Sequence, residues 1–538
     1  MVGLRSSRAR VRQPGPRPAA HRLLAQAATV AALFAFLPLL LPLLAVSPVS
    51  RATDVTEISP TVYIGGIQDL RPDSTGPSKC SRLVDAAATY GASTFKRAQF
   101  LVSVLWWDSG PRDPPAGYNG CQNYTLSTYY CFSRFNATSL LWWSYHRDPA
   151  TGTAAPVAQA DIDEFRGLLT ACLQHAVDQG LQPAINLHAD DGRAENGWRN
   201  TLPFDPLQKF QGFSYYDILL EPIADALNAV VLQGNSEAWL SLQGEMGATV
   251  FFYPWSWVQA AEMVRDRVSN GRPDLRYRVL LGLGINNSKL CGCVLIDVVN
   301  YDDYLAAFAP LWPSIQGWFD LEGIRAAFTA ADFVGISAYV PQNRTDYATC
   351  EMERLMQKMD DEFAYYNLTL RELVTDLGKQ IHWIEWGIGG GISQNGDTPA
   401  TTALQAAQYP FWGVWGPYNA SRDPWADPGV RDYMLYYVNQ TSNYLLQGGC
   451  EYVVEGCYLW TVSGSWDILG FYDQVSNPGG GSFRVEQAVD IIRRHNQLAH
   501  ALGQGQAAPV SESLAAGAAN PPVAQLLSGA FFAPAPRG

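Results

Sequence analysis

The sequence predicts a (β/α)8 barrel, and two features of residues 60–470 lead to that prediction. First, eight short apolar segments, rich in Val, Ile, Leu or aromatic residues, have the pattern of parallel strands buried on both faces. Second, amphipathic or polar stretches lie between these segments, as strand-then-helix units require. A doubly wound sheet is the alternative. No G-x-G-x-x-G motif follows the first segment, which counts against a dinucleotide-binding fold.

The predicted strands are, in chain order, 61–67, 99–107, 182–190, 238–247, 277–286, 332–341, 380–389 and 451–460. Among the stretches between them, 160–180, 215–231 and 360–379 have clear helical patterns. The first of these carries acidic residues in its first turn, and Gly180 is its expected C-cap. Stretches 106–148 and 391–430 are expected to be long surface insertions.

The N-terminus has the pattern of a targeting segment. Six arginines and no acidic residue precede the uncharged apolar run 23–46. A basic region followed by such a run is typical of a signal peptide, and the run is also long enough for a membrane anchor. We therefore expect a signal peptide or signal anchor at 1–52, the barrel domain at 53–503 and a disordered Ala/Pro/Gly-rich tail at 504–538. Either form of the N-terminus places the barrel outside the cytosol.

The composition excludes some classes of partner. The formal net charge is −13, so the chain lacks the basic character that nucleic-acid phosphates require. Only 16% of residues are charged, which argues against disorder. The 17 tryptophans and 26 tyrosines supply flat rings that either pack in a core or stack on sugars.

Sequons and cysteines agree with an extracellular protein. Seven N-x-S/T sequons occur, at Asn123, Asn136, Asn286, Asn343, Asn367, Asn419 and Asn439. The chain has nine cysteines, so at least one is unpaired if the others form disulfides. Cys121 with Cys131, and Cys450 with Cys457, are plausible local bridges. Cys291-Gly-Cys293 has no second C-x-x-C or histidine pair, so no metal site is expected there.

Polar or aromatic residues end the predicted strands, where a barrel of this kind carries its chemistry. Glu245 ends the fourth strand and Glu385 ends the seventh, between two tryptophans. The fourth and seventh strands lie on opposite sides of the barrel mouth. Two facing carboxylates suit glycoside hydrolysis, in which one donates a proton and the other attacks the sugar or activates water. The other strand-end candidates for substrate binding are His188, Asn286, Tyr339, Trp386 and Trp460.

The chain resembles the retaining glycoside hydrolases of the large (β/α)8 clan that includes cellulases and β-mannanases. The segments FVGISAYVP (333–341) and IEWGIGGG (384–391) look most like its mannanase-like branch. The resemblance covers roughly residues 55–500. It implies that Glu245 is the acid/base and Glu385 the nucleophile, that Tyr339 contacts Glu385, and that Trp460 floors a sugar subsite.

Two departures from the clan are plain. Most members have an asparagine before the acid/base, where it binds the sugar 2-hydroxyl, and this chain has Gly244. Gln243, His188 or Asn286 could take over that contact. The arginine common on the second strand is not obvious either, because that run ends in Trp106-Trp107-Asp108.

The resemblance implies a hydrolase of β-linked polysaccharide or oligosaccharide, of mannan or β-glucan type, that needs no cofactor and acts as a monomer. Glu245 should then hold a proton at neutral pH while Glu385 is ionised. Two alternatives stay open: an inactive carbohydrate-binding or cell-wall glycoprotein on the same barrel, and a transglycosylase. Each candidate also has a purely structural interpretation. Glu385 could pair with an arginine, and Trp460 could simply be core.

Overall fold

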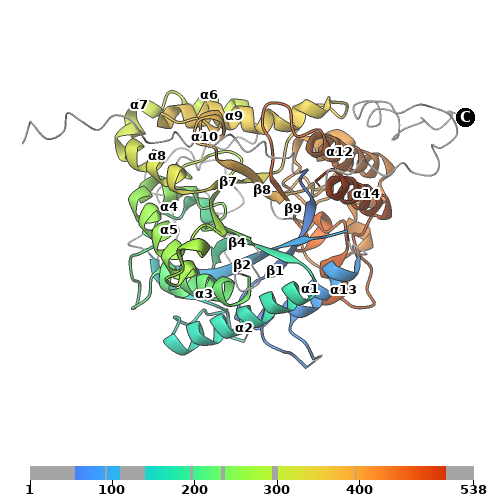
Figure 1. Ribbon diagram of the computed structural model, residues 1–538. Coiled ribbons are helices and arrows are strands. Elements are labelled where there is room, and N and C mark those ends of the chain that lie inside the picture. The colour runs from blue at the N-terminus through green and yellow to red at the C-terminus, as the bar shows by residue number, and fades with distance from the viewer. Residues whose placement is uncertain are drawn as a thin grey trace, which may run out of the picture. The chain divides into compact units, whose positions relative to one another are not determined.

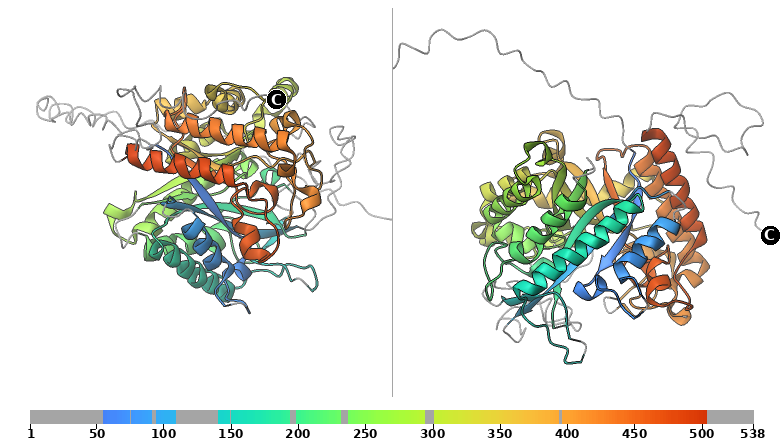
Figure 2. Two further views of the ribbon diagram at one scale, coloured as in Figure 1. Left: turned by 90° about the vertical axis from the view of Figure 1, so that its right-hand side faces the viewer. Right: turned by 60° about the horizontal axis from the view of Figure 1, so that its bottom comes forward.

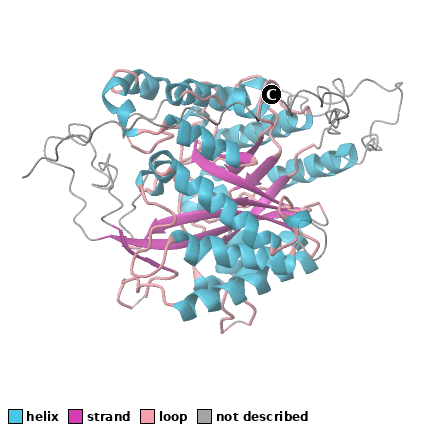
Figure 3. Ribbon diagram, turned by 60° about the vertical axis from the view of Figure 1, so that its left-hand side comes forward, coloured by secondary structure: helices cyan, strands magenta, loops and turns pink. Residues whose placement is uncertain are grey.

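The computed structural model describes residues 55–74, 76–90, 94–108, 140–148, 150–193, 198–231, 237–293, 301–393 and 396–503. These residues form a barrel of parallel strands surrounded by helices (Figures 1 and 3). The barrel strands are β1 (Ile58–Ile64), β2 (Arg97–Asp108), β4 (Gln182–Asp191), β5 (Ala238–Ser241), β6 (Val279–Asn286), β7 (Phe333–Ala338), β8 (Gln380–Trp386) and β9 (Gly456–Leu459).

The sheet closes on itself, because β1 pairs in parallel with both β2 and β9. The predicted (β/α)8 barrel is therefore confirmed, and the doubly wound alternative is wrong. Each predicted strand overlaps one barrel strand. An additional strand, β3 (Leu140–Ser144), pairs antiparallel with the end of β2. It lies in the predicted insertion 106–148 and has no counterpart among the strands expected from the sequence.

Two strands, β5 and β9, are less than half as long as predicted, with four residues each. After Ser241 the chain turns, because the side chain of Gln243 accepts the backbone N–H of Met246 at 2.8 Å and closes a loop. Before β9, the carboxylate of Glu353 accepts backbone N–H groups from residues 450–452 and holds them in a loop. In both places a buried side chain satisfies backbone groups that a longer strand would have paired.

The helices are α1 (Lys79–Tyr90), α2 (Gln159–Asp178), α3 (Glu221–Val230), α4 (Gly247–Phe252), α5 (Pro254–Ser269), α6 (Tyr301–Phe308), α7 (Trp312–Ile315), α8 (Leu321–Ala330), α9 (Arg354–Phe363), α10 (Leu370–Thr375), α11 (Ala403–Gln408), α12 (Pro428–Leu446), α13 (Phe471–Ser476) and α14 (Glu486–Gly503). Along the outside of the barrel, α2 packs on α3, α3 on α5 and α5 on α8. Figure 2 shows α12 and α14 side by side on another flank.

The predicted helix 160–180 is α2, and Gly180 follows it with φ of 80°, as a C-cap requires. The predicted helix 360–379 is wrong as a single element. Asn367 ends its first part in the left-handed conformation, with φ of 54°. The hydroxyl of Thr369 then caps α10 by accepting the N–H of Glu372 at 2.9 Å.

The barrel interior is layered. An apolar layer contains Ala184, Trp239, Phe333, Ile384 and Tyr458. A second apolar cluster joins Leu101, Tyr339, Trp460, Val462 and Trp466, and it includes residues that follow β7 and β9. Buried polar side chains, among them those of Thr61, Gln99, Asn186 and Ser241, also line the interior strands. The barrel interior is therefore not purely apolar, because these polar side chains lie among the apolar ones.

The disulfide pairing differs from the prediction. Cys80 pairs with Cys172, Cys291 with Cys293, and Cys350 with Cys450. The predicted Cys450–Cys457 bridge is wrong, because Cys457 is a buried residue of β9 with a free thiol. Cys350 and Cys450 are brought together by the loop that Glu353 organises, which no local spacing could indicate. Cys121 and Cys131 lie outside the described residues.

Within the described ranges, no helix is both long and apolar enough to cross a membrane. The predicted signal or anchor at 1–52 and the predicted tail at 504–538 lie outside those ranges.

Candidate active site

Glu385 lies in β8 at a β-bulge. The pairing with β7 passes from Trp383 directly to Glu385, which leaves Ile384 without a partner. A bulge turns two consecutive side chains toward one face of a sheet. Ile384 accordingly packs in the apolar layer of the interior, while Glu385 reaches the residues at the barrel mouth.

Two neutral groups contact the carboxylate of Glu385. Nε2 of His188 lies 2.8 Å from one oxygen, and the hydroxyl of Tyr339 donates to the other at 3.2 Å. Burial lowers the pKa of His188 to about 3, so the imidazole is neutral. An ionised carboxylate can only accept, so Nε2 of His188 is the donor when Glu385 is ionised. Burial also raises the pKa of Glu385 to about 7, although the charge of Arg199 and the Tyr339 hydrogen bond oppose the rise.

Glu245 follows β5 in a turn with left-handed backbone, at φ of 54°, which is uncommon for a residue with a side chain. One carboxylate oxygen accepts from Nδ2 of Asn286 at 2.8 Å. The other accepts from the guanidinium of Arg199 at 2.7 Å. Burial and the charge of Glu385 raise the pKa of Glu245, while the charge of Arg199 opposes them.

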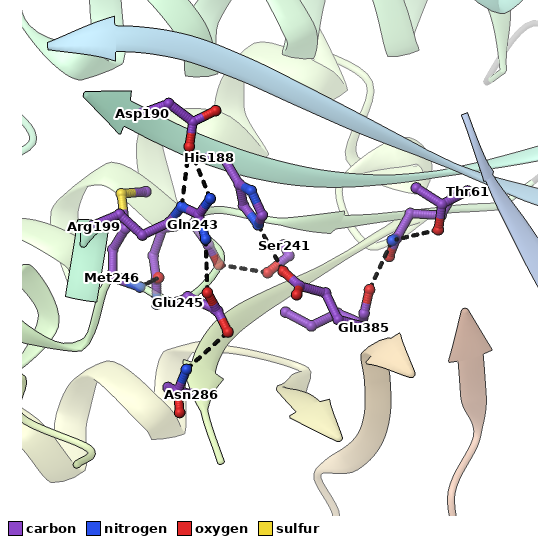
Figure 4. A network of polar contacts seen from close by, with 12 residues as sticks. Thr61, His188, Asp190, Arg199, Ser241, Gln243, Glu245, Met246, Asn286 and Glu385 are labelled. Atoms are coloured by element: carbon purple, nitrogen blue, oxygen red, sulfur yellow. Dashed lines mark hydrogen bonds and ion pairs between the residues drawn. The ribbon is translucent and has the colours of Figure 1, made fainter. Parts of the chain in front are cut away.

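Figure 4 shows the network that joins these groups. Glu385 lies in β8 and Glu245 in the turn after β5, and both carboxylates lie in one group of polar side chains, with His188 against Glu385 and Arg199 against Glu245. Arg199 also contacts Asp190 at 2.8 Å, so one guanidinium bridges two carboxylates. The structure thus brings together the two predicted glutamates and three predicted neighbours, namely His188, Asn286 and Tyr339.

Trp460 is at the mouth as well. Its ring centroid lies 5.9 Å from that of His188, and it packs in one cluster with Tyr339. The side chain is 6% exposed, so only a small part of the ring is open. Its predicted role in sugar stacking stays a prediction.

Trp386, predicted to bind substrate, is instead a core residue. Its side chain is fully buried and stacks on Tyr437 of α12, with ring centroids 5.9 Å apart. Trp383 stacks in the same way on Tyr444 of α12. The bulge explains the error, because strict alternation does not hold through residues 383–386 and both tryptophans face the helices.

Arg199 and Asp190 are not among the candidate site residues predicted from the sequence. Arg199 lies in a short 3-10 helix, Arg199–Thr201, in the loop after β4. The signal that could have found it is the absence of an arginine on the second strand, together with acidic residues at the end of the third predicted strand. Burial raises the pKa of Asp190, but the charge of Arg199 together with hydrogen bonds from Arg199 and Ser103 lowers the pKa below its ordinary value.

Gly244 is required by close packing against Asn186 of β4. A Cβ at this position would lie 2.4 Å from Oδ1 of Asn186, whose side chain is fully buried. An asparagine at 244, as in most of the clan it resembles, has no room here.

We expect Gly244→Ala to displace Glu245, lowering kcat by about tenfold or more and the free energy of unfolding by about 1–3 kcal/mol. Gly167→Ala is the matched control, because its Cβ would meet nothing within 4 Å on α2. The Gly167→Ala control should keep full activity, and its free energy of unfolding should rise by up to about 1 kcal/mol. Thermal unfolding and initial rates check both. Unchanged kcat and stability in Gly244→Ala would contradict the packing argument.

Among the described residues, no group of three or more His, Cys, Asp or Glu side chains is arranged to hold a metal ion. Cys291 and Cys293 are bonded to each other.

No family model matches the sequence, and no match is found among the curated proteins. Solved structures with a similar fold include a GH113 β-mannanase from Alicyclobacillus acidocaldarius, with 14% identity and a TM-score of 0.40, covering 83% of this chain and 99% of that one. A GH5-4 broad-specificity endoglucanase from an uncultured bacterium has 11% identity, a TM-score of 0.40 and coverages of 83% and 95%. A family 5 mannosidase from Rhizomucor miehei has 11% identity, a TM-score of 0.38 and coverages of 84% and 94%. The fold itself rests on the strand pairing described above.

Proposed function

We propose that this protein is a glycoside hydrolase that cleaves a β-linked polysaccharide or oligosaccharide, of mannan or β-glucan type, by retaining double displacement. The observation that carries the proposal is the pair Glu245 and Glu385, two buried carboxylates, one in the turn after β5 and one in β8, in one group of polar side chains at the barrel mouth. Glu362, a buried carboxylate elsewhere among the described residues, instead accepts four hydrogen bonds from neutral donors, the backbone N–H groups of Lys289 and Leu290 and the hydroxyls of Tyr301 and Tyr304.

In the first step, a carboxylate oxygen of Glu385 attacks the anomeric carbon and the bond from that carbon to the leaving oxygen breaks. Glu245 gives its proton to the leaving oxygen, and the sugar becomes an ester of Glu385. In the second step Glu245, now ionised, takes a proton from water as the water oxygen attacks the anomeric carbon. The ester bond breaks, and Glu385 and protonated Glu245 are restored.

The neighbours support these roles. Tyr339 and neutral His188 donate to Glu385 without adding a positive charge that would weaken it as a nucleophile. Burial and the nearby charge of Glu385 favour the protonated form of Glu245, as a general acid needs. When Glu385 becomes an ester its charge is lost, so the pKa of Glu245 falls and Glu245 can act as a base.

The test uses the full chain, a panel of β-linked polysaccharides and a measurement of reducing ends. The proposal expects release of reducing ends from one of them, lost in Glu245→Gln and Glu385→Gln while binding persists. Binding without turnover at any pH would replace it with the carbohydrate-binding alternative. Products larger than the substrate would show a transglycosylase.

The pH dependence of kcat/KM should report the ionisation of the Glu385 carboxylate. Its pKa is raised from 4.5 to about 7, so below pH 7 the carboxylate takes up a proton and the nucleophile is lost. On the acidic limb of the pH profile, below the pKa of Glu385, we expect kcat/KM to fall about tenfold per pH unit. Tyr339→Phe removes a hydrogen bond that favours the ionised form, so its limb should move to higher pH. A limb near pH 4.5 in both proteins would contradict the assignment.

We also propose that the protein is secreted or held at the cell surface. Three disulfides form within the described residues, which suits an oxidising compartment. Among the described sequons, Asn343, Asn367 and Asn419 are exposed, Asn439 is buried, and Asn286 is engaged with Glu245. Glycan at the three exposed sites, found by peptide mapping of protein from its own cells, would support this location, and unmodified peptides would count against it.

A further inference from the structure

Arg199 occupies a particular position in the network at the barrel mouth. Its Nη1 donates to Oε2 of Glu245 at 2.7 Å, and its Nη2 donates to Oδ1 of Asp190 at 2.8 Å. The side chain is 19% exposed, so most of the guanidinium is withdrawn from water. A largely buried cation between two carboxylates interacts with both far more strongly than a surface pair does.

The backbone around Arg199 is fixed by the next residue. The fully buried side chain of Asn200 accepts the N–H of Gly247 at 2.7 Å and donates to the carbonyl of Lys289 at 2.8 Å. Gly292 packs so closely on the carbonyl of Asn200 that a Cβ there would lie 1.7 Å from it. Arg199 is therefore presented by a turn clamped between the segment after Glu245 and the disulfide-closed loop after β6.

The same short turn holds Glu245 in two ways. Asn200 binds the backbone two residues after Glu245, and Arg199 binds its carboxylate. This double contact restrains the left-handed backbone of Glu245 as well as the direction of its side chain. A general acid must be placed to within a fraction of an ångström of the oxygen it protonates.

Several titratable groups from the elements around Arg199 influence the carboxylate of Glu245. Those that face Arg199 or Glu245 are Tyr63 of β1, His188 and Asp190 of β4, Tyr339 after β7 and Glu385 of β8. His188 and the tyrosines are neutral at pH 7, because burial lowers the pKa of His188 and raises those of Tyr63 and Tyr339. Arg199 is thus the cation that balances Asp190, Glu245 and Glu385.

We propose that Arg199 is the positioning residue of Glu245, holding its carboxylate in place and biasing it toward the ionised form that the second step needs as a base. The proposal rests on the proposed function for the role of Glu245, but the contact with Arg199 stands independently. Asp190 shares the guanidinium and keeps it at the mouth when Glu245 takes up its proton. The arginine thereby keeps one carboxylate usable both as acid and as base.

The primary test reads the proton on Glu245 directly and does not depend on turnover. Carbon-13 NMR of the full chain labelled at the glutamate Cδ gives a titration for each carboxylate, and the signal of Glu245 is the one that Glu245→Gln removes. Arg199→Gln should raise the pKa of Glu245 by about 1 unit or more, because the opposite charge is lost. Arg199→Lys keeps a charge and should raise it less. An unchanged titration in Arg199→Gln would overturn the proposal.

Arg193→Gln is the matched control. Arg193 lies in the same loop, but its guanidinium pairs with Asp108 at 2.9 Å and donates to the carbonyl of Asp108. It should leave the titration of Glu245 unchanged. If Arg199→Gln does not fold, as judged by thermal unfolding, Arg199→Lys and wild type still decide the question, because identical titrations in those two would also overturn the proposal.

The kinetic readout separates positioning from general loss of structure. With a substrate whose leaving oxygen needs a proton, both limbs of the pH profile of Arg199→Gln should move to higher pH, because Arg199 lowers the pKa of both glutamates. With an activated aryl glycoside, only the limb due to Glu385 should move. Equal slowing of both substrates with unmoved limbs would contradict the role. Absence of turnover in wild type would reject the proposed function, while the NMR titration would still decide the role of Arg199.

Discussion

Replacing Glu385 with glutamine is expected to lower kcat on the best polysaccharide by at least ~10³-fold. An amide oxygen is a far poorer nucleophile than a carboxylate, and no second carboxylate lies within hydrogen-bond contact of His188 and Tyr339 among the described residues. The glutamine oxygen can still accept one of these two hydrogen bonds. Substrate binding should therefore persist while turnover disappears. Initial rates and equilibrium binding of the same oligosaccharide measure the two effects separately.

Glu353→Gln is the matched control for this variant. Glu353 is another buried glutamate, but it holds the loop at residues 450–452 and the hydroxyl of Tyr444, outside the catalytic network. Its replacement should cost stability and leave kcat nearly unchanged. A loss of activity in Glu353→Gln as large as that in Glu385→Gln would point to general damage. Retention of full turnover by Glu385→Gln would reject the nucleophile assignment outright.

Replacing Glu245 with glutamine should have an effect that depends on the leaving group. On a polysaccharide, whose leaving oxygen must be protonated, we expect kcat/KM to fall about 10²–10⁴-fold. On an aryl glycoside with a strongly acidic phenol, the first step needs no proton, so kcat/KM should stay close to that of wild type. Its kcat should still fall, because the second step loses its base. The ester intermediate then accumulates, and a burst of phenol is the measurement that reveals it.

Asp191→Asn controls for a charge change at the same mouth. Asp191 ends β4, and its carboxylate accepts the N–H of Arg193 at 3.0 Å. The change in kcat/KM caused by Asp191→Asn should be the same for substrates with either leaving group. If Glu245→Gln slowed both substrates equally, Glu245 would be a structural residue and the proton donor would have to be sought elsewhere.

Both glutamates could be found from the sequence because parallel barrel strands are buried on both faces, so a carboxylate at the end of an apolar run stands out. The strands themselves were recognisable for the same reason. The closure of the sheet through β1 and β9 follows from eight such units. What the pattern could not reveal is the register within a strand. The extra residue in β8 places Glu385 in the barrel and turns Trp386 toward α12, and nothing in residues 380–389 marks it.

Long-range contacts were equally inaccessible. Arg199 comes from a loop, and only the folded chain shows that it reaches a glutamate 46 positions away. Cys350 and Cys450 are 100 residues apart, so the nearer Cys457 looked like the natural partner of Cys450. The break at Asn367 depends on one residue in a left-handed conformation, which a helical periodicity over 360–379 conceals. In each case tertiary structure overrode a local pattern.

The most direct test of the central claim is to trap the sugar on Glu385. A 2-fluoro glycoside with a dinitrophenolate leaving group, matched to the best substrate of the panel, slows both steps but allows the first to run ahead of the second. Mass spectrometry of the digested full chain should then find one added fluorosugar on the peptide that contains Glu385, and none in Glu385→Gln. A label on a different residue, or turnover of the panel substrate with inversion at the anomeric carbon and no label, would contradict the account.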